Sequence, residues 1–306
     1  FDGLCVTDSA ARHFDTYVHG DDPSDLSHSS VWCIVKDRQG TLWIGTYFGG
    51  VNYFNPEYEI YTRYRKADSP SEGLSSPIVG KMTEDKNGLL WICTEGGGVT
   101  VLDRRTGRFR WYPSSSSDTQ TLSHINIKAI CYDADDDIMW IGTHTGGLNR
   151  LDMRTGKVKR YTAVGDDGHS LPSNIIRDIL PYRGSLLLAT KSGVALFNPR
   201  SGECRKLFTD SPQGRTIGAV ADICFDSEGK LWIAAEGQGV YCYDFGKNLL
   251  TNYRHDSQDP LSISSNNVIS ILCDSRNNLW FGHAGTGIDL FRPDTYDFEN
   301  YDSRRT

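Results

Sequence analysis

The stretch from Leu42 to Asn52 reads LWIGTYFGGVN, and close copies of it recur along the chain. Its aromatic and β-branched residues predict a strand, and Gly49-Gly50 predicts a tight turn into a second strand. The other copies are LWICTEGGGVT from Leu90, MWIGTHTGGLN from Met139, LWIAAEGQGVY from Leu231, LWFGHAGTGID from Leu279 and the weaker LLLATKSGVAL from Leu186. The chain is therefore predicted to be a repeat protein.

The repeat has a period in the forties. The Trp of each copy, or the residue in its place, stands at position 43, 91, 140, 187, 232 or 280, so the steps are 48, 49, 47, 45 and 48 residues. Short strands at this period are typical of β-propeller blades. A helical solenoid would need apolar residues at a spacing of about 3.6, which these segments lack.

One complete unit begins at Val31 and contains four predicted strands. They are Val31–Asp37, Thr41–Thr46, Val51–Asn55 and Ile60–Tyr64, with a turn at Pro56 before the last. First strands end on an aspartate that can hydrogen-bond its own turn, at Asp37, Asp85, Asp133, Asp226 and Asp274. Fourth strands are predicted to end on an aromatic residue, at Tyr64, Tyr112, Tyr161, Phe208, Tyr253 and Tyr301.

The fourth unit departs from the repeat. Leu187 replaces the Trp, Tyr182 replaces the turn aspartate, and one glycine before Val194 is missing. Pro181 predicts that the first strand of this unit stops pairing early.

We therefore predict an all-β fold, a single β-propeller domain over residues 1–306 with four-stranded blades. Full blades are expected at about 31–64, 79–112, 127–161, 176–208, 220–253 and 268–301. Residues 1–18 are predicted to form half a blade. Their two predicted strands, Gly3–Asp8 and His13–Tyr17, match only the third and fourth strands of the repeat unit. A seven-bladed ring whose remaining strands lie outside this chain would account for the half blade, because closure removes exposed edges. A six-bladed ring with an extra hairpin is the alternative.

Charge and cysteine usage exclude several classes of function. A net charge of −7 over 306 residues disfavours general binding to nucleic acid or to an anionic membrane. The eight cysteines follow the repeat, and Cys131 and Cys224 share one register of two units, where they would lie too far apart to bridge. No pair has C-x-x-C spacing, so the cysteines are expected to be small buried hydrophobic residues.

Binding residues are expected where the long inter-blade loops meet the glycine turns. These loops, such as residues 20–30, are long and varied, and binding groups gather on variable loops over a rigid scaffold. The residue ahead of the glycine turn differs between units: Tyr47 and Phe48, then Glu95, His144, Lys191, Glu236 and His283. Trp32, Lys128 and Arg177, early in first strands, are expected near the same mouth. Such a mixture would suit an oligosaccharide or another polar ligand. The alternative is that these are ordinary solvated turn residues and that Trp32 is partly buried packing.

Other kinds of site find no support in the sequence. The histidines show no metal-ligand spacing, the repeated aspartates fit turn capping, and Gly96-Gly97-Gly98 leads to a strand and not to a phosphate-binding helix. We predict no metal, no cofactor and no catalytic residues.

The repeat resembles a known family. Met139–Tyr161, MWIGTHTGGLNRLDMRTGKVKRY, is nearly a consensus copy of the two-component regulator propeller repeat, and Asp259–Val268 carries its inter-blade part. The resemblance covers almost the whole chain, and the fourth unit and Ala234-Ala235 depart from it. The family has no site motif that can be transferred to individual residues.

The resemblance implies the periplasmic sensor region of a bacterial hybrid two-component histidine kinase. The expected function is an extracytoplasmic propeller that senses an oligosaccharide, without enzymatic activity, in an inner-membrane-anchored receptor whose kinase domain lies elsewhere. Expected partners are a further propeller and a β-sandwich domain of the same receptor and a second copy in a homodimer, without nucleic acid or direct membrane contact. A propeller that relays a signal through protein contacts without a small ligand is one alternative, and a polysaccharide-active enzyme is another.

Overall fold

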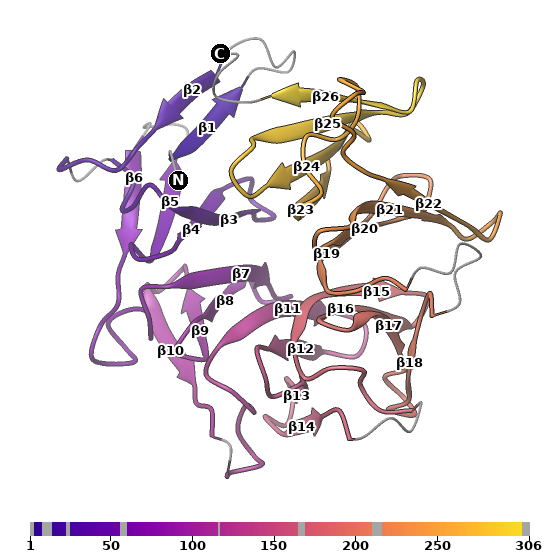
Figure 1. The fold of residues 1–306 in the computed structure, drawn as a ribbon. Helices are drawn as coiled ribbons and strands as arrows, with labels where there is room; N and C mark the ends of the chain where they lie inside the picture. The colour runs from indigo at the N-terminus through magenta and orange to yellow at the C-terminus, as the bar shows by residue number, and fades with distance from the viewer. Residues whose placement is uncertain are drawn as a thin grey trace. The chain divides into compact units, whose positions relative to one another are not determined.

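The computed structural model describes residues 3–7, 14–22, 25–55, 60–115, 117–164, 169–209 and 216–301. All regular secondary structure in these ranges is β (Figure 1). The chain divides into two compact units, Phe1–Tyr161 and Thr162–Thr306, which are described in turn. His13, the turn at Pro56 and residues 302–306 lie outside the described ranges.

The first unit contains a two-stranded sheet and three four-stranded blades. The two-stranded sheet pairs β1 (Leu4–Thr7) with β2 (Phe14–Tyr17). The first blade is β3 (Val31–Lys36), β4 (Leu42–Thr46), β5 (Val51–Asn55) and β6 (Ile60–Tyr64). The second blade is β7 (Val79–Glu84), β8 (Leu89–Thr94), β9 (Val99–Asp103) and β10 (Arg108–Tyr112). The third blade is β11 (Ile127–Asp133), β12 (Ile138–Thr143), β13 (Leu148–Asp152) and β14 (Val158–Tyr161).

The second unit contains three more four-stranded blades. The fourth blade is β15 (Ile176–Tyr182), β16 (Ser185–Thr190), β17 (Gly193–Phe197) and β18 (Cys204–Lys206). The fifth blade is β19 (Val220–Phe225), β20 (Leu231–Ala235), β21 (Gly239–Asp244) and β22 (Leu249–Tyr253). The sixth blade is β23 (Val268–Cys273), β24 (Leu279–His283), β25 (Ile288–Arg292) and β26 (Asp297–Tyr301).

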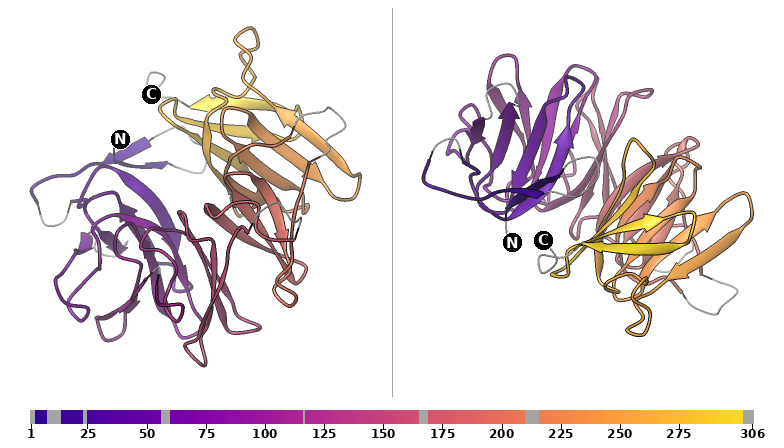
Figure 2. Two further views of the ribbon diagram at one scale, coloured as in Figure 1. Left: turned by 60° about the horizontal axis from the view of Figure 1, so that its bottom comes forward. Right: turned by 90° about the horizontal axis from the view of Figure 1, so that it is seen from above.

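Each blade is an antiparallel meander in which neighbours in sequence are neighbours in the sheet. Within each unit the blades pack in chain order, with β7 between β3 and β11 and with β19 between β15 and β23 (Figures 1 and 2). The predicted all-β propeller of four-stranded blades is confirmed. The described residues form six four-stranded sheets and one two-stranded sheet, and closure into a seven-bladed ring stays a prediction.

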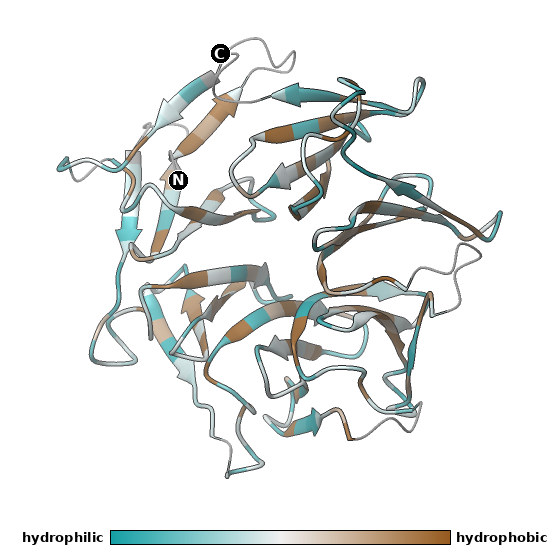
Figure 3. Cartoon of the chain, in the orientation of Figure 1, coloured by the Kyte–Doolittle hydropathy of each residue, from teal (hydrophilic) through white to brown (hydrophobic). Residues whose placement is uncertain are grey.

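The repeated Trp packs between blades, as predicted. Trp43 is buried against Val79, Met82 and Leu90 of the second blade, and Trp232 packs on Phe281 of the sixth. Burying a large apolar side chain stabilises the fold by roughly 1.5–3 kcal/mol. Hydrophobic residues lie mainly on the strands, whereas the loops between them are mostly hydrophilic (Figure 3).

The turn aspartate and the Trp form one unit, which the sequence pattern did not reveal. Asp37 accepts hydrogen bonds from the backbone N–H groups of Gln39 and Thr41, as expected of a turn cap, and also from Trp43 Nε1 at 2.8 Å. Burial alone would raise the pKa of Asp37, but these hydrogen bonds and the charge of Arg104 lower it. The same indole-to-carboxylate bond joins Trp91 to Asp85, Trp232 to Asp226 and Trp280 to Asp274. The fourth blade lacks both partners.

Two predictions for the fourth blade are wrong. Pro181 does not end the first strand, since it pairs with Leu186 inside β15, an edge strand in which a missing N–H is tolerated. Phe208 does not end the fourth strand. The N–H of Leu207 bonds the carbonyl of Val194 at 2.8 Å, so Leu207 takes the register that Tyr64 has opposite Val51 in the first blade.

The cysteines are free thiols. Cys93, Cys204 and Cys242 are buried, which agrees with their predicted role as small hydrophobic residues, and burial raises the pKa of Cys204 to about 12. Cys5 differs because it is exposed.

Candidate functional site

The residue ahead of the glycine turn differs between blades, and we call its place the variable position. The same backbone hydrogen bond holds this position in every described blade. The N–H of the residue after the second strand bonds the carbonyl of the residue before the first strand, as from Tyr47 to Ser30 at 2.9 Å and from Glu95 to Ile78 at 3.0 Å. The other four such pairs are His144 with Asn126, Lys191 with Ile175, Glu236 with Ala219, and Ala284 with Asn267. The inter-blade loops and glycine turns therefore meet at one end of each blade. The backbone is fixed there while the side chain varies.

The prediction that His283 is the residue ahead of the glycine turn is wrong. His283 pairs with Val268 as Thr46 pairs with Val31, so it ends β24 and Ala284 takes the variable position. Its side chain is buried, and Nε2 lies 2.7 Å from Oδ2 of Asp289. His283 is therefore part of the blade interior and not of the loop end.

A β-bulge places a second variable residue at the same end. In first strands the pairing register slips by one residue, between Val31 and Cys33 in β3, for example. The extra residue in these bulges is Trp32, Lys128 or Arg177. Since a bulge re-aims the side chain of its extra residue, these three leave the regular alternation of the strand.

Three predicted residues of the first blade come together with one that was not predicted. The rings of Trp32 and Tyr47 stack at 4.8 Å with an interplanar angle of 16°, and Phe48 meets Tyr47 edge-on at 4.5 Å. His28 from the inter-blade loop lies 6.0 Å from Phe48. Trp32 is 52% exposed and Phe48 57% exposed. We call His28, Trp32, Tyr47 and Phe48 the aromatic cluster.

The loop histidine had a signal in the sequence. His28 precedes the first strand by three residues, and His124 precedes the first strand of the third blade by the same distance. Each ring accepts a backbone hydrogen bond at Nδ1, from Ser30 in one case and from Asn126 in the other. This bond leaves Nε2 as the N–H donor of the neutral ring.

The charged candidates are largely neutralised by each other. Glu95 pairs with the bulge residue Lys128, and Glu236 pairs with the bulge residue Arg177. Because each charge has a partner, neither pair presents a free charge to a ligand. His144 and Lys191 are exposed, and the His144 ring lies 6.4 Å from His124.

The described residues contain no group of three or more His, Cys, Asp or Glu side chains suited to a metal ion. No helix able to span a membrane occurs among them.

Comparison with known proteins identifies the repeat. The family described as "Two component regulator propeller" matches residues 25–48 and 262–285. No curated protein matches the chain.

Solved structures share the fold. One is the extracellular domain of a putative hybrid two component system of Bacteroides thetaiotaomicron, with 22% identity, a TM-score of 0.73 and coverage of 91% of this chain and 35% of that one. Another is the extracellular domain of a putative one component system of the same organism, with 21% identity, a TM-score of 0.67 and coverage of 99% and 46%. A third is PorZ, a surface component of the type-IX secretion system of Porphyromonas gingivalis, with 15% identity, a TM-score of 0.64 and coverage of 86% and 38%. The chain thus spans less than half the length of each.

Proposed function

Since the chain carries two component regulator propeller repeats, we propose that it is the extracytoplasmic, ligand-sensing propeller of a two-component signalling receptor and that its ligand is an oligosaccharide. In this proposal the domain itself is not an enzyme. A kinase domain in another part of the receptor acts on the signal and alters transcription. The periplasmic location, the further propeller and β-sandwich domains and the homodimer belong to the same proposal.

The aromatic cluster is the observation that supports a sugar ligand. Trp32 and Phe48 expose more than half of their surface at the loop end of the first blade, although large aromatic side chains are usually buried. Exposed apolar surface of this kind marks binding sites. Flat rings present an apolar face to the C–H groups of a sugar, while His28 Nε2 and the Tyr47 hydroxyl can hydrogen-bond its hydroxyl groups.

A panel of oligosaccharides tests this proposal. At least one sugar is expected to raise the melting temperature of the chain by mass action, in a concentration-dependent way. Trp32→Ala and Phe48→Ala are expected to weaken that sugar's binding roughly threefold to tenfold, because each removes an aromatic contact worth roughly 0.5–1.5 kcal/mol. Calorimetric titration measures the loss.

The matched control is Tyr296→Ala, which removes an exposed aromatic residue from the turn between β25 and β26. It should leave sugar binding unchanged. If no sugar of a broad panel binds the intact receptor ectodomain, the oligosaccharide proposal fails, and the propeller that relays a signal through protein contacts replaces it.

A further inference from the structure

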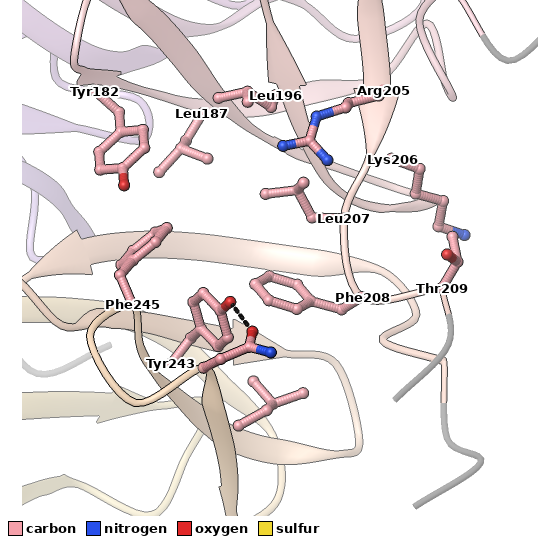
Figure 4. Close-up of a pocket in the computed structure, with 12 residues that line it drawn as sticks. Tyr182, Leu187, Leu196, Arg205, Lys206, Leu207, Phe208, Thr209, Tyr243 and Phe245 are labelled. Carbon is pink, nitrogen blue, oxygen red and sulfur yellow. Dashed lines mark hydrogen bonds between the residues drawn. The ribbon is translucent and has the colours of Figure 1, made fainter. Parts of the chain in front are cut away.

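The second unit contains a pocket between the fourth and fifth blades, with a volume of about 500 Å³ (Figure 4). Residues of β15–β18 and the segment that follows line one side, and residues of β21 and β22 line the other. The volume lies in the range of roughly 300–1,000 Å³ that small-molecule sites occupy.

The pocket lies where the fourth blade has lost two aromatic rings of the repeat. In the first blade, Trp43 stacks on Tyr64 with centroids 6.1 Å apart. The fourth blade has Leu187 in place of the Trp and Leu207 in place of the Tyr, and both leucines line the pocket. The same aromatic pair is present in the other blades, as Trp91 with Tyr112, Trp140 with Tyr161, Trp232 with Tyr253 and Trp280 with Tyr301.

Aromatic rings form the walls of the pocket. Tyr182, which replaces the turn aspartate, stacks on Phe245 of the fifth blade at 4.8 Å and 24°. Tyr243 meets Phe245 edge-on at 4.7 Å and Phe208 edge-on at 4.8 Å. Its hydroxyl donates to Asn248 Oδ1 at 2.6 Å, so this ring is held in place. A flat apolar ligand can pack between these aromatic rings and the leucine side chains.

Among the described residues that line the pocket, Arg205 and Lys206 are the charged ones, and both are cations. Neither forms an ion pair with any residue that the structure describes. Figure 4 shows the Arg205 guanidinium over the apolar side chains, with the Lys206 ammonium beside Thr209. The neighbouring pocket between the fifth and sixth blades, of about 430 Å³, differs because it keeps its Trp and is lined by four carboxylates together with Lys230 and Lys247.

We propose that the pocket between the fourth and fifth blades binds a small aromatic carboxylate, with Arg205 bound to the carboxylate and the ring held among the aromatic and leucine side chains. A guanidinium that has no ion-pair partner among the described residues and lies beside an apolar pocket favours a carboxylate, because the two groups form charge-assisted, bidentate hydrogen bonds. The site shares no residue with the aromatic cluster of the first blade, so its test is independent of the oligosaccharide proposal.

Titration with benzoate and with benzamide, its neutral counterpart, tests the assignment. Ligand-observed NMR on the chain is expected to show saturable binding of benzoate and binding of benzamide that is weaker by roughly tenfold or more. Arg205→Gln should reduce benzoate binding to the benzamide level. Arg200→Gln, which removes an exposed arginine of the same blade, should change neither.

Refilling the hollow provides a second test that does not depend on charge. Leu187→Trp introduces the side chain that the other five blades carry, and it should abolish the binding of both probes while the melting temperature stays at or above that of the parent chain. If Leu187→Trp does not fold, Leu207→Tyr fills the same space. The assignment is overturned if benzoate does not saturate, if benzoate and benzamide bind equally, or if benzoate binding survives either Arg205→Gln or the refilled pocket.

Discussion

The sixth blade replaces a buried polar pair of the repeat by His283 and Asp289. The corresponding pair is Thr46 and Asn52 in the first blade and Thr143 and Asn149 in the third. Asp289 keeps the role of the asparagine, since its Oδ2 accepts a hydrogen bond from the Ser264 N–H at 2.8 Å, and it gains the contact to His283. Both side chains are fully buried, and the contact to Asp289 is the hydrogen bond that satisfies Nε2 of His283.

We predict strong coupling between these two residues. His283→Thr or Asp289→Asn alone should lower the free energy of unfolding by about 2–4 kcal/mol, because the first leaves the buried Asp289 carboxylate with only the Ser264 N–H and the second removes the carboxylate that faces the buried His283 ring. The double variant has the Thr and Asn pair of the first and third blades. Its loss of unfolding free energy should be smaller, by about 1–3 kcal/mol, than the sum of the losses of the two single variants. Urea unfolding of the four proteins measures this coupling. His144→Thr, at an exposed histidine, is the control, and strictly additive losses would show that the pair is not a unit.

Among elements, the fourth strand of a blade holds the inter-blade loop that precedes the blade. The residue ahead of the strand's last aromatic donates to loop carbonyls, as Arg63 does to Asp22 and Asp25 and as Trp111 does to Gly73. Arg160 binds the carbonyls of Ser115, Asp118, Thr121 and Leu122. In the first three blades, the preceding inter-blade loops are therefore positioned from the outer edge of the blade.

Arg160→Ala is expected to destabilise the chain by roughly 2 kcal/mol, since four loop carbonyls lose a charged donor at once. The same change should speed cleavage of the loop around Asp118 by subtilisin several-fold. Arg160→Lys should restore only part of the loss, because an ammonium cannot match the planar fork of the guanidinium. Arg154→Ala removes an exposed arginine from the turn between β13 and β14 of the same blade and should behave like the parent. Unchanged cleavage in Arg160→Ala would contradict the inference that Arg160 holds this loop in place.

At the scale of the whole molecule, the stability of a repeat protein is close to a sum over its repeats and their interfaces. The fourth blade departs furthest from the repeat, and its last strand is the shortest of the six described blades. It lacks the Trp–Asp hydrogen bond, its last strand β18 has three residues, and Phe208 just beyond it has a φ of 59°. The last strands of the other five blades have four or five residues.

Amide hydrogen exchange should therefore be faster in β18 than in β6, β10, β14, β22 or β26. Regions with fewer buried contacts open at lower free energy, and exchange under native conditions reports that opening. Mass spectrometry of peptic peptides measures the ranking. Leu187→Trp should slow exchange in β18 and leave β26 as it was, whereas equal exchange in all six last strands would show that the blades open as one unit.

The parts of the fold that could be predicted are those encoded within one repeat. A strand and its turn depend on residues a few positions apart, so Trp43, Asp37 and the glycine turns could be placed from their spacing alone. The errors occurred where a repeat departs from the consensus. The glycines that follow His283 are shifted relative to those of the other blades, which obscures its register, and Leu207 stands where the other blades have an aromatic residue.

The candidate site shows the same division. The sequence alone determined that Trp32, Tyr47 and Glu95 lie at the loop end of their blades. Successive turns of an antiparallel meander lie at alternate ends of the blade, so the inter-blade loops and the glycine turns share one end. Only the tertiary structure decided which of them touch. Trp32 stacks on Tyr47 through a bulge, while Glu95 and Glu236 reach partners 33 and 59 residues away in other blades. Contacts across such separations depend on how blades pack, which no local pattern encodes. The pocket at Leu187 and Leu207 likewise depends on tertiary structure, because it is the space left between the side chains of two neighbouring blades.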